Sequence, residues 1–157
     1  MKVKGIVHED FVNFKLPSMF IIFPHCSFKC EKESGVCCCQ NSSLALEETK
    51  DVSFSYIADA YVSNPITKAV VFGGLEPFDS FNDMLLLVKC LRLKTNDPIV
   101  IYSGYTKDEL KHKIKSLFDF GNIIIKFGRY IPGHQPHLDP VLGVKLASDN
   151  QYAEKIS

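Results

Sequence analysis

The chain has 157 residues, which suits one compact domain with a hydrophobic core and is short for two ordinary ones. Its 18 Lys and Arg residues balance 18 Asp and Glu residues, so no overall charge attracts nucleic acid or an anionic membrane. No apolar run approaches the roughly 20 residues that span a bilayer, and Met1-Lys2-Val3-Lys4 does not lead into a signal-like apolar core. We therefore expect a cytoplasmic protein with a single domain, residues 1–157.

Short apolar runs alternate with helical periodicities along the chain. Four β-rich runs predict strands at residues 19–23, 69–72, 99–102 and 123–127. Three predicted helices have their apolar faces at Phe54 to Tyr61, Phe81 to Leu91 and Leu110 to Leu117. We expect Ser80 to cap the second helix, and Thr106 and Glu109 to form a capping box on the third. Residues 142–157 fit either strand or loop.

Strands that alternate with helices indicate right-handed βαβ units around a parallel sheet. We therefore predict an α/β fold of βα repeats, and the length favours a small, open partial TIM-like barrel over the roughly 250 residues of a full one. The loops that follow parallel strands lie along one edge, where α/β proteins form ligand sites. Here those loops contain the cysteines, Gly73-Gly74-Leu75-Glu76-Pro77, Ser103-Gly104-Tyr105 and Gly128-Arg129-Tyr130.

The cysteine loop, at about residues 24–42, holds five of the six cysteines. Cys26 and Cys30 are followed by the triplet Cys37, Cys38 and Cys39. Thiolates bind iron–sulfur clusters or zinc, and no oxidising context supports a disulfide framework. Three thiolates leave one iron of a 4Fe-4S cluster open, whereas a zinc knuckle would use Cys26, Cys30 and two of the triplet. The position among the other strand-end loops favours the cluster.

Outside this loop, each candidate residue also has an ordinary structural explanation. Cys90 fits the core face of a helix, because free cysteine often behaves as a small buried hydrophobe. Glu76 offers an acceptor for a ligand ammonium group, although an isolated glutamate in a glycine turn is more often solvated. We expect Lys126 and Arg129 to be surface cations, with pairing to a ligand carboxylate as the alternative.

Together these motifs resemble a known family. Cys26-x3-Cys30 with a further cysteine, followed after the next strand by Gly73-Gly74-x-Glu76-Pro77, is similar to the radical S-adenosylmethionine (SAM) enzymes. The chain more narrowly resembles the small activating proteins of anaerobic ribonucleoside-triphosphate reductase. Tyr102-Ser103-Gly104-Tyr105-Thr106 looks like their Y-T-G-Y-T segment, and Ser148-Asp149-Asn150-Gln151 looks like their S-x-N-Q segment. The resemblance covers most of the chain.

The resemblance implies that Cys26, Cys30 and Cys39 bind three irons of a 4Fe-4S cluster and that SAM ligates the fourth. The family's usual spacing is C-x3-C-x2-C, whereas six residues separate Cys30 from Cys37 and eight separate it from Cys39. The segment Cys39-Gln40-Asn41-Ser42 resembles long-loop relatives and favours Cys39, with Cys37 and Cys38 as alternatives. The aromatic residue that usually precedes the third ligand is missing.

The same resemblance implies where SAM binds. The residues involved would be Gly73, Gly74, Glu76 and Pro77 at the methionyl end, and Ser103, Gly104 and Tyr105 at the nucleoside end. The implied function is an activase that generates a glycyl radical on a partner reductase subunit, with an electron donor such as flavodoxin or ferredoxin. The alternatives are a radical SAM enzyme for a small molecule or peptide, and a non-catalytic zinc or iron–sulfur interaction module.

Overall fold

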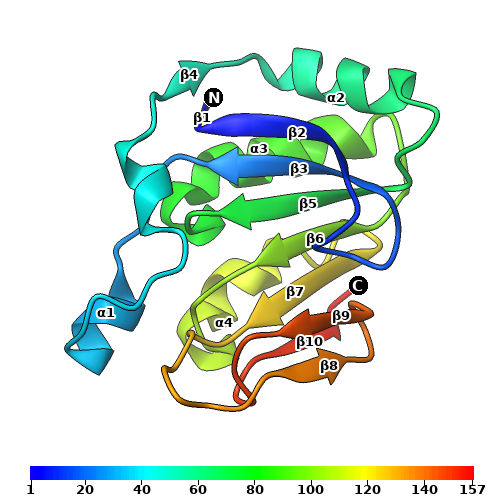
Figure 1. Ribbon diagram of the computed structural model, residues 1–157. Helices are drawn as coiled ribbons and strands as arrows, with labels where there is room; N and C mark the ends of the chain where they lie inside the picture. The colour runs from blue at the N-terminus through cyan, green and yellow to red at the C-terminus, as the bar shows by residue number, and fades with distance from the viewer.

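The computed structural model describes residues 1–157, and a six-stranded mixed sheet forms its centre (Figure 1). The strand order is β10-β7-β6-β5-β3-β2. The strands are β2 (Gly5–Asp10), β3 (Ser18–Phe23), β5 (Ala69–Gly74), β6 (Ile99–Tyr102), β7 (Ile123–Phe127) and β10 (Tyr152–Lys155). The four central strands run parallel, whereas β2 and β10 pair antiparallel at the two edges.

Helices α2 (Phe54–Ser63), α3 (Phe81–Arg92) and α4 (Lys107–Lys115) connect the consecutive parallel strands. The cysteine loop contains the short helix α1 (Lys29–Ser34) and is followed by the 3-10 turn η1 (Ser42–Leu46). A second 3-10 turn, η2 (Pro77–Ser80), precedes α3. Two small antiparallel sheets complete the fold, formed by β1 (Lys2–Val3) with β4 (Lys50–Asp51) and by β8 (His137–Asp139) with β9 (Val144–Leu146).

Both faces of the central sheet are buried, which explains why its parallel strands are continuous apolar runs. Successive side chains point to opposite faces, so Val70 and Phe72 pack against the helices while Ala69 and Val71 pack on the other side. The helix-side core is the larger one, and Figure 1 shows α3 and α4 behind the sheet. The second core includes Phe14 from the β2–β3 loop and residues of the β8–β9 hairpin.

The structure confirms the four predicted parallel strands, the three helices and the capping box at Thr106. It corrects the prediction for Ser80, whose hydroxyl makes no capping bond and is buried without a partner. The sheet is open and mixed rather than all parallel, so the partial TIM-like barrel stays a prediction. No helix is long and apolar enough to cross a bilayer.

Gly74 ends β5 at a close approach to the neighbouring strand. Its φ of 78° lies in the left-handed region, and a Cβ there would lie 2.5 Å from the Ile22 side chain on β3. We expect Gly74→Ala to lower the free energy of unfolding by roughly 2 kcal/mol or more, because about 1–2 kcal/mol of left-handed strain adds to the clash.

Gly133→Ala is the matched control, since Gly133 has a φ of 83° and open space around the added Cβ. Urea unfolding of both variants, followed by circular dichroism, separates the clash from the backbone strain. Equal losses in the two variants would contradict the proposed close approach.

Candidate functional site

A cavity of about 490 Å³ lies at the carboxyl ends of the parallel strands, and the loops after all four of them line it. Of the residues that sequence analysis assigned to a site, eight line this cavity: Cys26, Cys30, Cys39, Gly74, Glu76, Ser103, Gly104 and Tyr105. Gly73 and Pro77 do not line it. Gly73 instead packs beside Phe20 and Tyr102, and Pro77 is a buried residue that begins η2.

Only three of the five cysteines in the cysteine loop line the cavity. Cys26, Cys30 and Cys39 line it, whereas Cys37 and Cys38 do not. The Cys37 thiol is exposed and donates to Glu31, which also accepts the backbone N–H of Cys39 at 3.2 Å. The fold therefore distinguishes Cys39 from its two neighbours by placing it with the first two cysteines.

Burial makes the first two thiols hard to ionise in the protein alone. Burial raises the pKa of the Cys26 thiol to about 12, and the nearby Glu76 and Asp79 carboxylates add to this, while the Phe28 N–H bond opposes it. Burial also raises the pKa of the Cys30 thiol to about 11, with further contributions from Cys39 and Cys38. A metal ligand must be a thiolate, so these sites need a cationic group to hold them deprotonated.

Glu76 joins the loops after β5 and β6. Its Oε1 accepts the Phe78 N–H at 3.1 Å and the Ser103 hydroxyl at 3.0 Å, and its Oε2 accepts the Gly104 N–H at 2.8 Å. The residue is 6% exposed, and burial raises the pKa of its carboxyl to about 7 even though all three donors lower it. Glu76 is thus a buried acceptor, not the solvated glutamate of an ordinary turn.

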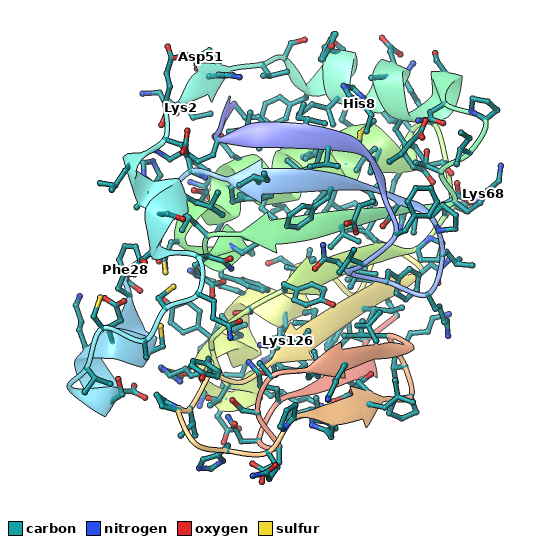
Figure 2. The ribbon with its side chains drawn as sticks, in the orientation of Figure 1. Lys2, His8, Phe28, Asp51, Lys68 and Lys126 are labelled. Carbon is teal, nitrogen blue, oxygen red and sulfur yellow. The ribbon has the colours of Figure 1, made fainter.

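Lys126 and Arg129 are not the surface cations that we expected. Lys126 is 6% exposed, and its Nζ donates to the carbonyls of Gly128 at 2.7 Å and Ser103 at 3.4 Å. Burial lowers the pKa of its ammonium to about 8. Figure 2 labels Lys126 on β7 and Phe28 in the cysteine loop. Sequence pattern alone did not predict this burial, because it depends on the tertiary contacts of Lys126 with Ser103 and Gly128.

Arg129 has a 10% exposed side chain that is already paired. Its two terminal nitrogens donate to Glu109 at 2.9 and 2.6 Å, and its Nε lies 3.0 Å from a Glu33 carboxylate oxygen. Lys29 also donates to Glu109, so α1, α4 and the loop after β7 meet in one ion network. This network holds the cysteine loop against the strand-end loops.

The Ser148-Asp149-Asn150-Gln151 segment fixes the far wall of the cavity. The Ser148 Oγ accepts the Ile131 N–H at 3.0 Å, and the Asn150 amide donates to the Arg129 carbonyl at 2.9 Å. The Gln151 amide donates to the Gly128 carbonyl, which also accepts from Lys126. The segment that resembles the S-x-N-Q motif therefore has a physical role, because its side chains bind the backbone of the loop after β7.

Residues 18–146 match the model of a protein family that is described as "4Fe-4S single cluster domain". The chain belongs to this family of iron–sulfur domains. The match spans β3 to β9 and therefore includes the cysteine loop and most loops of the cavity. Comparisons with curated proteins and with solved structures found no match. No three His, Cys, Asp or Glu side chains are grouped closely enough to hold a single metal ion.

We predict that Cys39 is the third cluster ligand of this 4Fe-4S domain. Cys39→Ser should abolish cluster binding, because Cys39 lines the cavity with Cys26 and Cys30, whereas Cys37→Ser and Cys38→Ser should retain it. Iron and sulfide content and the visible absorption of the anaerobically reconstituted variants measure the effect. Full cluster content in Cys39→Ser, with loss in either neighbouring variant, would reverse the assignment.

Proposed function

We propose that this iron–sulfur domain is a radical SAM enzyme in which Cys26, Cys30 and Cys39 bind three irons and SAM binds at the fourth. One observation carries the proposal: three thiols, a buried carboxylate and a buried ammonium line the same cavity at the strand ends. Soft thiolates suit the cluster, and two opposite buried charges suit the zwitterionic amino-acid end of SAM. The cavity volume lies in the usual range for small-molecule sites, about 300–1,000 Å³.

The cluster and SAM would supply the chemistry. When bound, they would allow one-electron reductive cleavage of the sulfonium carbon–sulfur bond to methionine and a 5'-deoxyadenosyl radical, and this radical would take a hydrogen atom from a partner's glycine to give 5'-deoxyadenosine and a glycyl radical. The protein's part is to bind, orient and exclude water. An external one-electron donor such as flavodoxin or ferredoxin is proposed to reduce the cluster.

Glu76 is the proposed partner of the methionyl ammonium. Its Oε1 already accepts two donors, whereas Oε2 accepts only the Gly104 N–H and keeps an acceptor position. The backbone beside Gly74 can also approach the ligand closely, because this residue has no side chain and lines the cavity. Ser103 and Gly104 then act partly through Glu76, since both donate to it and fix its orientation.

Lys126 is the proposed partner of the methionyl carboxylate. Arg129 is engaged by Glu109 and Glu33, whereas Lys126 lines the cavity and forms no ion pair with any carboxylate of the chain. Its Nζ bonds two carbonyls and therefore has a third donor for a ligand anion. Burial of an unpaired ammonium is costly, and an anionic ligand would offset that cost.

Lys126→Met should weaken SAM binding by about tenfold or more, because charge-assisted hydrogen bonds contribute roughly 1.5–3 kcal/mol. The variant should keep its cluster. Anaerobic isothermal titration of the reconstituted protein with SAM measures the affinity.

Lys113→Met is the matched control, because Lys113 also donates to a backbone carbonyl, that of Phe78, but does not line the cavity. Unchanged SAM affinity in Lys126→Met, at wild-type cluster content, would remove Lys126 from the binding site.

The proposed substrate is a glycine loop of a partner reductase. The cavity wall formed by the β2–β3 loop and β9 contains Val12, Val144 and Leu146, and Phe20 adds to it from β3. The same wall contains Asn13 and Lys145, so it offers a peptide segment both apolar contacts and polar partners. The Tyr102-Ser103-Gly104-Tyr105-Thr106 and Ser148-Asp149-Asn150-Gln151 segments, which resemble those of reductase-activating proteins, further support this choice.

The function is tested by mixing the reduced cluster protein, SAM and a candidate anaerobic ribonucleotide reductase without oxygen. We expect a glycyl-radical doublet by electron paramagnetic resonance, together with 5'-deoxyadenosine. The Cys26→Ser variant and a reductase whose radical glycine is replaced by alanine should both give no doublet. Cleavage of SAM without a doublet on any cognate reductase would favour a small-molecule or peptide substrate instead.

A further inference from the structure

Asp79, in η2, bonds the residue that follows the first cysteine. Its Oδ2 accepts the Ser27 N–H at 2.6 Å, and its Oδ1 accepts the Tyr105 hydroxyl at 2.6 Å. The Tyr105 hydroxyl also lies 3.2 Å from the Ser27 Oγ. A single carboxylate therefore links three loops: the cysteine loop, the loop after β5 and the loop after β6.

Asp79 has no cation of the chain within ion-pair distance. It takes part in none of the ion pairs, and both of its bonds are to uncharged groups. Its Oδ2 lies 2.6 Å from the backbone nitrogen of Ser27, the residue directly after Cys26, so the charge sits beside the first proposed ligand. A fixed negative charge beside a cluster ligand disfavours the addition of an electron to the cluster.

The bond to Ser27 has a second effect in the same direction. Hydrogen bonds from backbone N–H groups to cluster and ligand sulfurs stabilise the reduced, more negative state and raise the reduction potential. The Phe28 N–H donates to the Cys26 sulfur at 3.3 Å, but the Ser27 N–H is held by Asp79. The carboxylate thus keeps one neighbouring amide away from the sulfur.

We infer that Asp79 is a positioning residue that holds the first cluster ligand in place and keeps the reduction potential of the cluster low. The inference rests on the proposed role of Cys26 as a ligand, but it does not depend on SAM cleavage or on the glycyl-radical partner. A low potential serves the proposed reaction, because cleavage of a sulfonium requires a strong one-electron reductant. Charges and hydrogen bonds in the protein around a cluster tune its reduction potential, and Asp79 would supply one of each.

The test compares Asp79→Asn with wild type in reductive titrations of the anaerobically reconstituted protein, followed by electron paramagnetic resonance. The reductant is dithionite with mediators, and SAM is absent. We expect the one-electron reduction equilibrium to favour the reduced cluster by about tenfold more in Asp79→Asn, which corresponds to a positive shift of about 59 mV. Asp83→Asn is the matched control, because it removes the same charge from α3 and should leave the potential unchanged.

Tyr105→Phe provides a second, independent variant should Asp79→Asn lose its iron. This change removes a donor from the carboxylate but keeps its charge, so the potential should become more negative. An unchanged potential in Asp79→Asn at wild-type iron content, or an unchanged or more positive potential in Tyr105→Phe, would overturn the inference. Failure of the wild-type protein to bind a cluster would instead overturn the proposed function.

Discussion

The parallel pairing of β3, β5, β6 and β7 is the constraint on which the site depends. Parallel strands place the loops after their carboxyl ends at one edge, and each of these four loops contributes to the same cavity. The helices between the strands make this order possible, because a parallel pair needs a crossover connection. The cysteine loop thereby gains neighbours that are far from it in sequence.

Within this frame, hydrogen bonds to side chains join the loops to one another. Glu76 connects the loop after β5 to the loop after β6, and Arg129 connects the loop after β7 to α1 and α4. These side-chain bonds are separate from the backbone hydrogen bonds of the helices and strands. Polar side chains therefore hold the loops together at the cavity, as apolar packing holds the elements together in the two cores. Burying these polar groups costs free energy, which their hydrogen bonds offset.

The sequence was sufficient for the elements with a strong local signal. Apolar runs identified the four parallel strands, and the residue pattern at Thr106 identified the capping box. The edge strand β2 was missed because Gly5–Asp10 is not a continuous apolar run, and its residues Val7, His8 and Glu9 are exposed, so no local pattern indicates its pairing with β3. The burial of Lys126 was missed for a related reason: it depends on tertiary contacts with Ser103 and Gly128, which no local pattern reveals.

The antiparallel pairing of β10 with β7 has a consequence for the order of folding. The wall that surrounds Lys126 is completed by residues 148–151, which follow β7 in the chain by about 20 residues, whereas the cysteine loop lies far earlier. Contacts between segments distant in sequence form late, after the loop-closure entropy has been overcome. During synthesis the thiols would thus leave the ribosome well before their cavity can close. The thiols would therefore be exposed to oxygen and to competing metals until residues 148–151 have been synthesised and have reached the loop after β7.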